Sequence, residues 1–223
     1  MRFVDYPDRD QLYLDLAGIL AGELKSALDH QDRALFIVPG GTTPGPVFDL
    51  LSAIHLDWPR VDVTLSDERW VPEDHTRSNT RLLKERLLIG PAAQANLISL
   101  YDGAKQPEDS VTRLETSLNE HLPPAVLLLG MGADMHTASL FPGSDGLSHA
   151  LSRDAGTLVA MRPADQEEAR ISFSARVLNG ALSKHLIITG DEKRAALNRA
   201  KGLNALNAPI NSVMDDMTVH WAK

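Results

Sequence analysis

The sequence predicts an α/β protein with a Rossmann-like, mostly parallel sheet and helices on both of its faces. Short, wholly apolar runs alternate along the chain with longer segments in which apolar residues recur at helical spacing. That alternation is typical of β–α–β units, whose parallel strands are buried on both faces and carry few polar residues. No linker, internal repeat or change in composition divides the 223 residues, so we expect one domain spanning residues 1–223.

The start of the chain contains the first helix and the first clear strand. Arg9–Leu28 places leucines three and four positions apart and predicts an amphipathic helix. Ala34–Val38 is a short apolar run that ends at glycines and predicts a buried strand. Thr43 and Pro44 are residue types that cap and open a helix, and we expect that helix to continue to Ile54.

The remainder of the chain continues the alternation. Further strands are predicted at Val61–Ser66, Asn96–Leu100, Ala125–Leu129, Thr157–Met161, Arg170–Ser174 and His185–Thr189. Helices are predicted at Ser78–Ile89, Pro107–Leu122 and Asp191–Gly202, and the segment that follows Ser66 is expected to be a polar loop. In sheets of this kind ligands bind beyond the carboxyl ends of the strands. Polar or glycine-rich segments follow four of those ends, and we expect the four loops to meet at one pocket.

Composition narrows the kind of protein. The chain has no cysteine, which excludes disulfides, thiolate metal sites and a cysteine nucleophile. A net charge of −8 without a cluster of lysines and arginines argues against nucleic acid as a partner. No apolar run is long enough to cross a membrane, and the first residues do not resemble a signal peptide. We therefore expect a cytoplasmic protein.

The loop after the first strand, PGGTTP, has the composition of an anion site. Gly40 and Gly41 allow a ligand to approach the backbone closely, and the N–H groups of a following helix attract negative charge. Thr42 and Thr43 offer hydroxyl donors. The structural alternative is a tight turn with a helix cap. The loop is not a Walker motif, because no Gly-Lys-Ser/Thr follows.

Cations and one acid lie at other strand ends. Asp67 and Arg69 follow the strand that ends at Ser66, in a charged segment that is otherwise typical of solvated surface. Arg170 begins a strand, and Lys193 lies in the first turn of a helix, where a cation is disfavoured unless an anion binds there. Each has a structural interpretation by itself, but Arg170 and Lys193 beside the glycine-rich helix start would form a phosphate site.

The segment GMGADMH, residues 130–136, follows a buried strand and places Asp134 two residues before His136. Histidine is suited to proton transfer near neutral pH, and a carboxylate can orient the imidazole. The alternative is a histidine satisfied by a loop carbonyl, with Asp134 capping a helix. The chain contains no GxSxG motif, no convincing third metal ligand and no third glycine of a dinucleotide fingerprint. We therefore expect no metal and no cofactor.

Five ordered blocks of the sequence resemble the 6-phosphogluconolactonase family. They are PGGTTP (39–44), SDERWVPEDHTRSN (66–79), LLLGMGADMHTASLFPG (127–143), RISFSARVLN (170–179) and TGDEKRAAL (189–197), and the closing TVHWA is similar to the family's final strand. The resemblance implies a fold shared with sugar-phosphate deaminases and isomerases. It also implies that His136 is the catalytic base, with Asp67 and Arg69 nearby. The residues that would hold the substrate phosphate are Gly40, Gly41, Thr42, Arg170 and Lys193.

Two positions within the motif are informative. The family usually has glycine between the aspartate and the histidine, where this chain has Met135. If that position requires positive φ or a close backbone approach, methionine should strain or reshape the turn and alter the kinetics. The related glucosamine-6-phosphate deaminases carry a glutamate where this chain has Phe141. The absence of that proton carrier favours the lactonase.

The resulting hypothesis is hydrolysis of 6-phospho-D-glucono-1,5-lactone to 6-phosphogluconate without a metal. Neutral His136 would take a proton from water, and loop N–H groups or Arg69 would stabilise the oxyanion. The alternatives are a deaminase or isomerase on the same fold and a non-catalytic sugar-phosphate sensor. Both a monomer and a homodimer are compatible with the sequence.

Overall fold

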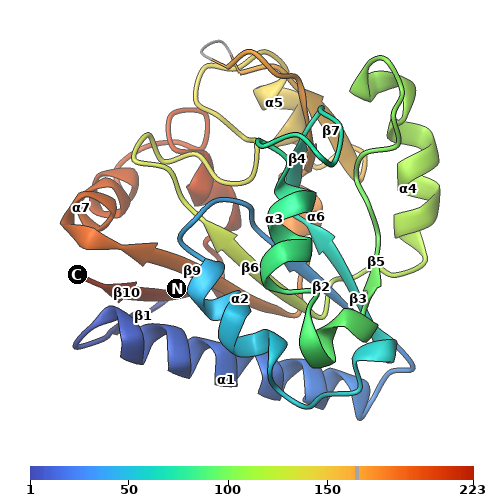
Figure 1. Ribbon diagram of the computed structural model, residues 1–223. Coiled ribbons are helices and arrows are strands. Elements are labelled where there is room, and N and C mark those ends of the chain that lie inside the picture. The colour runs from blue at the N-terminus through green and yellow to red at the C-terminus, as the bar shows by residue number, and fades with distance from the viewer. Residues whose placement is uncertain (164–165) are drawn as a thin grey trace.

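A computed structural model describes residues 1–163 and 166–223 of the chain (Figure 1). In this part of the chain the main sheet has seven strands in the order β1-β10-β9-β6-β2-β3-β5, and every neighbouring pair is parallel. The strands of this sheet are β1 (Arg2–Asp5), β2 (Ala34–Val38), β3 (Val61–Leu65), β5 (Asn96–Leu97), β6 (Val126–Gly130), β9 (Ser183–Thr189) and β10 (Thr218–Ala222). The predicted fold class, a mostly parallel α/β sheet, is confirmed.

The helices connect these strands and cover the sheet. They are α1 (Arg9–Leu28), α2 (Gly45–Ser52), α3 (Asn79–Arg86), α4 (Val111–Asn119), α5 (Leu147–Ala150), α6 (Ala175–Asn179) and α7 (Gly190–Ala200). The chain moves in one direction along the sheet from β1 through β2 and β3 to β5, and then in the opposite direction through β6 and β9 to β10. Because crossover connections between parallel strands are right-handed, this reversal assigns α1, α2 and α3 to one face and α4 and α7 to the other.

The reversal creates a switch point between two neighbouring strands. β2 pairs with β6 through Phe36↔Val126 and Ile37↔Leu127, but the connections that leave these strands run to opposite sides. The loops that follow β2 and β6 therefore separate at the carboxyl edge of the sheet. This is where open α/β sheets bind their ligands.

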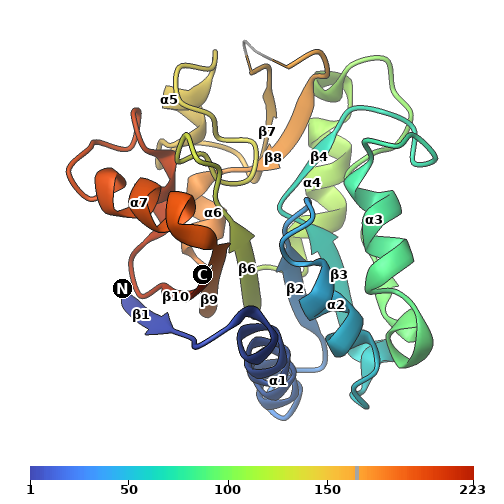
Figure 2. The same ribbon diagram turned by 60° about the vertical axis from the view of Figure 1, so that its left-hand side comes forward.

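A small antiparallel sheet lies beside this edge (Figure 2). Its strands are β4 (Asp67–Arg69), β8 (Arg170–Phe173) and β7 (Leu158–Met161), in the order β4-β8-β7. The expectation of a polar loop after Ser66 is wrong, because β4 is a strand whose first two residues are buried. Its charged side chains find partners inside the protein, so no alternation of apolar residues marks it as a strand.

Several predicted element limits are also corrected. The first helix has the predicted bounds, and the Asp8 carboxylate caps it by accepting from the N–H of Gln11 at 2.8 Å. The next helix ends at Ser52 rather than at Ile54, and its N-cap is Pro44 without a side-chain cap, so Thr43 does not cap it. The expected strand Asn96–Leu100 pairs with β3 only over β5. The predicted helix at Pro107–Leu122 consists of a short 3₁₀ turn and α4.

Buried apolar residues from both sheets and from the covering helices form one hydrophobic cluster. Every residue of β2 and β3 is buried, which explains why these strands read as continuous apolar runs apart from Asp62 and Thr64. Across the described ranges, no helix combines the length and the apolar character needed to span a membrane.

Candidate functional site

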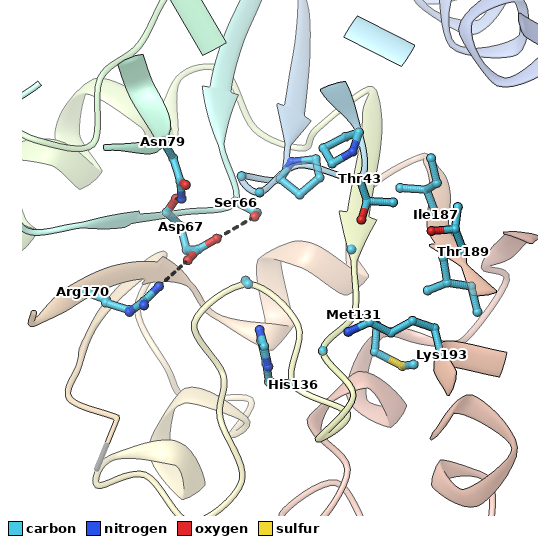
Figure 3. A pocket seen from close by; sticks show the side chains of 18 of the residues that line it. Thr43, Ser66, Asp67, Asn79, Met131, His136, Arg170, Ile187, Thr189 and Lys193 are labelled. Carbon is cyan, nitrogen blue, oxygen red and sulfur yellow. Dashed lines mark hydrogen bonds and ion pairs between the residues drawn. The ribbon is translucent and has the colours of Figure 1, made fainter. Parts of the chain in front are cut away.

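A cavity of about 210 Å³ opens at the switch point, between the loops that follow β2 and β6. Side chains from β4, β8 and β9 and from the first turn of α7 complete its wall (Figure 3). The predicted site residues that line it are Gly40, Gly41, Thr43, Asp67, Arg69, His136, Arg170 and Lys193. The four strand-end loops therefore meet at one pocket, as the sequence predicted.

His136 reaches the cavity from the loop after β6, and Asp134 holds its ring. The Nδ1 atom of His136 lies 2.6 Å from Oδ1 of Asp134, and the backbone N–H of His136 donates to the same oxygen at 3.2 Å. This leaves Nε2 as the ring nitrogen available to a ligand. Burial raises the pKa of Asp134, but the hydrogen bond and the charge of His136 outweigh that effect, and the pKa lies below its ordinary value.

The loop that carries this pair is closed tightly by its own backbone. The N–H of Gly132 donates to the carbonyl of His136 at 2.9 Å, and the N–H of Met135 donates back to the carbonyl of Gly132 at 3.0 Å. A Cβ atom on Gly132 would lie only 2.1 Å from Nδ1 of His136 and 2.2 Å from Oδ1 of Asp134. Position 132 therefore requires glycine, because the side chains of Asp134 and His136 lie against its backbone.

Asp67 and Arg170 form a buried charged pair on neighbouring strands. β4 and β8 are antiparallel, with Asp67 opposite Ser172 and Arg69 opposite Arg170. The carboxylate of Asp67 accepts from the hydroxyls of Ser66 at 3.1 Å and Ser139 at 2.5 Å, and it lies 3.8 Å from Nη1 of Arg170. Burial lowers the pKa of Arg170, and Asp67 opposes that effect.

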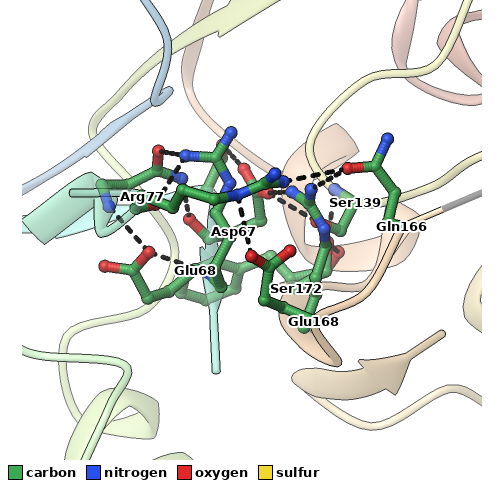
Figure 4. Close-up of polar contacts among 12 residues, drawn as sticks. Asp67, Glu68, Arg77, Ser139, Gln166, Glu168 and Ser172 are labelled. Carbon is green, nitrogen blue, oxygen red and sulfur yellow. Dashed lines mark hydrogen bonds and ion pairs between the residues drawn. The ribbon is translucent and has the colours of Figure 1, made fainter. Parts of the chain in front are cut away.

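A buried carboxylate behind this pair fixes the neighbouring residues (Figure 4). Glu68 accepts from the backbone N–H groups of Arg69 and Asn79, both at 2.8 Å, and from the N–H and hydroxyl of Thr80, both at 2.7 Å. It thereby joins β4 to the first turn of α3. Burial raises the pKa of Glu68, and these donors oppose the rise.

Asn79 connects this scaffold to the glycine loop. Its Oδ1 accepts from Nη1 of Arg69 at 2.6 Å, and its Nδ2 donates to the carbonyl of Asp67 at 3.0 Å. A Cβ atom on Gly40 would overlap the amide of Asn79, with 2.1 Å between the Cβ and Oδ1. Glycine at position 40 is therefore needed so that the loop can pack against α3. The guanidinium of Arg69 is occupied in part by this framework.

Lys193 and Arg170 lie on opposite sides of His136 in the cavity (Figure 3). Lys193 extends from the first turn of α7, with its ammonium directed into the cavity (Figure 3). Asp191, which precedes it by two residues, pairs instead with Lys223 at 3.6 Å. The two cations flank the imidazole rather than forming a single cluster.

Two predicted site residues lie outside the cavity wall, and several lining residues were not predicted. Asp134 lies behind His136, and Thr42 belongs to the adjoining surface hollow, which also contains Arg77. The lining residues that the sequence did not single out include Ser66, Asn79, Met131, Ile187 and Thr189. Asn79 ends the block SDERWVPEDHTRSN, so its place in that block was the available signal. Within the described ranges, no group of three histidine, aspartate or glutamate side chains could hold a metal ion.

Comparison with known proteins agrees with the sequence blocks. The family model described as "Glucosamine-6-phosphate isomerases/6-phosphogluconolactonase" matches residues 7–221. The chain is 41% identical over 211 residues to a protein of Pseudomonas aeruginosa named 6-phosphogluconolactonase, covering 92% of this chain and 88% of that protein. It is 36% identical over 199 residues to a 6-phosphogluconolactonase of Caulobacter vibrioides, covering 86% and 84% of the two chains.

A solved structure extends the similarity to three dimensions. The crystal structure of a 6-phosphogluconolactonase from Shewanella baltica superposes with a TM-score of 0.96 at 32% identity, covering 100% of this chain and 98% of that one. With the sequence model, the relatives and the structure in agreement, the chain belongs to the glucosamine-6-phosphate isomerase/6-phosphogluconolactonase family.

Proposed function

We propose that this protein hydrolyses 6-phospho-D-glucono-1,5-lactone to 6-phosphogluconate, with His136 as the general base and without a metal ion. The observation that carries the proposal is the Asp134–His136 pair, with Nδ1 engaged at 2.6 Å and the ring in a cavity flanked by two cations. Similarity to proteins named 6-phosphogluconolactonase supports the choice of substrate. The chemistry is ester hydrolysis in a ring, so it requires an activated water and a proton for the departing oxygen.

The proposed mechanism uses both protonation states of His136. Neutral His136 takes a proton from water through Nε2, because Asp134 occupies Nδ1. The hydroxide-like oxygen attacks the lactone carbonyl, and the imidazolium then donates its proton to the ring oxygen as that bond breaks. Asp134 stabilises the imidazolium between these steps. A positioned acid and base of this kind contributes about 10²–10⁴-fold to the rate.

The two cations are proposed to bind different groups of the substrate. In the lactone the phosphate is on C6 and the reacting carbonyl is C1, on either side of the ring oxygen, so separate cations can hold the two groups. Arg170 contacts the ring of Phe141, which stacks on His136, and it therefore belongs to the reacting end. We assign the phosphate to Lys193 together with the loop that contains Gly40 and Gly41. Asp67 keeps Arg170 in place, and Arg170 rather than the partly occupied Arg69 faces the developing oxyanion.

Purified wild-type protein should release 6-phosphogluconate from the lactone faster than spontaneous hydrolysis, and it should not release ammonia from glucosamine 6-phosphate. Ammonia release without lactone hydrolysis would instead identify a deaminase. Binding of 6-phosphogluconate without any turnover would identify a sugar-phosphate sensor.

Substitution of each cation tests which group of the substrate it binds. Lys193→Met should raise KM about tenfold or more with little change in kcat, because it removes binding that is equal in the ground and transition states. Arg170→Met should mainly lower kcat. If both variants raised only KM, Arg170 would belong to the phosphate site. Steady-state kinetics on the lactone, with thermal denaturation to confirm folding, distinguishes these outcomes.

A further inference from the structure

Phe141 contacts the catalytic histidine directly, although it does not line the cavity. Its ring stacks on the imidazole of His136 with 4.1 Å between centroids and 25° between planes. The guanidinium carbon of Arg170 lies 5.3 Å from the centroid of the same phenyl ring. One aromatic side chain therefore touches both the imidazole and a neighbouring cation of the site.

The backbone between the two rings forces this contact. Thr137 and Leu140 form an isolated antiparallel bridge, and the N–H of Leu140 donates to the carbonyl of Thr137 at 3.0 Å. The hydroxyl of Thr137 donates to the carbonyl of Gly130 at 2.9 Å and ties this turn to the end of β6. The chain thus reverses immediately after His136 and returns Phe141 to the face of the imidazole.

The imidazole is consequently held on three sides. Asp134 engages Nδ1, Gly132 leaves no room for a Cβ beside the ring, and Phe141 covers one face. Stacked aromatic rings prefer a defined offset, and a phenyl face attracts positive charge. The phenyl ring therefore limits rotation of the imidazole.

We propose that Phe141 is a positioning residue for His136. It fixes the plane of the imidazole and so keeps Nδ1 on Asp134, and that hydrogen bond selects the tautomer in which Nε2 faces the substrate. Phe141 acts through His136 and Arg170 and does not touch the substrate. This assignment rests on the proposed role of His136 as the base.

The test replaces the ring and then restores it. Phe141→Leu should lower kcat on the lactone about tenfold, the size expected for loss of an aromatic pair, and leave KM within about twofold. Phe141→Tyr keeps the ring and should recover most of kcat. Nitrogen-15 NMR of the histidine side chains should show a single His136 tautomer, protonated at Nδ1, in wild type and Phe141→Tyr. A mixture of tautomers is expected in Phe141→Leu.

Phe3→Leu is the matched control. Phe3 also lies under an arginine, Arg194, whose guanidinium carbon is 5.5 Å from the ring centroid, but Phe141 and not Phe3 stacks on His136. Phe3→Leu should leave kcat and the His136 tautomer unchanged. If Phe141→Leu failed to fold, Phe141→Met would replace it in the same measurements.

Wild-type kcat and an unchanged tautomer in a folded variant without the ring would overturn the proposal. A fall in kcat with an unchanged tautomer would also overturn it, since Phe141 would then act on turnover through Arg170 and not by positioning His136. Wild-type protein that did not hydrolyse the lactone would refute the proposed function, whereas the NMR comparison would still decide whether Phe141 positions His136.

Discussion

Met135 lies between the two members of the Asp134–His136 pair with a φ of 69°. This is the left-handed region, which costs a residue with a Cβ roughly 1–2 kcal/mol and costs glycine almost nothing. Position 135 therefore has the positive φ for which we expected a methionine to be strained. The backbone of Met135 is retained by the N–H of Ile210, which donates to its carbonyl at 3.1 Å, and its side chain packs against the core.

A pair of substitutions at Met135 isolates the backbone effect. Met135→Gly should be about 1 kcal/mol more stable than Met135→Ala, because only the alanine variant keeps the left-handed strain. At Met214, where φ is −79°, the order should reverse, because alanine is normally favoured over glycine. Urea denaturation of the four variants measures both differences. Greater stability of Met135→Ala than of Met135→Gly would show that the turn is not strained.

Some residues of the site were predictable from the sequence because charged or titratable side chains are unusual at their positions. His136, Asp134 and Lys193 stand at strand or helix ends without an apolar pattern to explain them, and the structure places His136 and Lys193 in the cavity wall and Asp134 directly behind His136. Asn79 was not predicted, because an asparagine at a helix start has an ordinary capping explanation. Its role depends on a contact with Gly40, which lies in a separate loop.

At the scale of elements, the attachment of β4 to α3 depends on Glu68. Glu68→Gln should destabilise the protein by about 2–3 kcal/mol, because an amide NH₂ would face backbone N–H groups that now donate to a carboxylate. Glu85→Gln on the same helix is the matched control, since Glu85 is exposed and pairs with Arg81. Chemical denaturation should show at most about 0.5 kcal/mol for that control. Equal losses in the two variants would contradict the proposed anchoring.

Most strands of the main sheet were predictable because burial on both faces leaves a nearly continuous apolar run. β2 and β6 show this most clearly. β1 was not predicted, because it is largely exposed and carries no such run. β4 was not predictable, because its residues are charged and its partner β8 lies about a hundred positions later in the chain. Only the folded arrangement shows that Asp67 meets Ser139 and Arg170. The sequence therefore indicated some of the residues that line the cavity, and tertiary pairing determines the others and how all of them are arranged.

At the scale of the whole molecule, a buried polar chain joins the first and last parts of the sequence. The hydroxyl of Tyr6 lies 2.9 Å from Nδ1 of His220, Nε2 of His220 lies 2.9 Å from Nδ1 of His185, and Nε2 of His185 lies 2.7 Å from Glu23. These side-chain contacts connect β9 and β10 to α1. Burial, with the neighbouring charge of His185, lowers the pKa of His220 from 6.5 to about 4.

This shift predicts an acid-dependent loss of stability. Between pH 6.5 and about 4 the unfolded chain binds a proton at His220 that the folded protein does not, so stability falls as the pH falls through this window. Above pH 6.5, His220 contributes no pH dependence to the stability. Across the whole window it lowers the free energy of unfolding by roughly 3 kcal/mol.

Denaturation curves near pH 7 and pH 5 should therefore differ less in His220→Phe than in wild type. His30→Phe, at an exposed histidine, should keep the wild-type difference. An unaltered difference in His220→Phe would show that another group causes the acid sensitivity.

The lactone hydrolysis rate of His136→Ala tests most directly whether the imidazole of His136 performs the proton transfer in the cavity. Measured in a coupled assay and corrected for the spontaneous reaction, turnover should fall by about 10²–10⁴-fold. Calorimetric binding of 6-phosphogluconate should persist in the same variant, because Lys193 and the glycine loop are intact. Turnover equal to that of the wild-type protein would contradict the account.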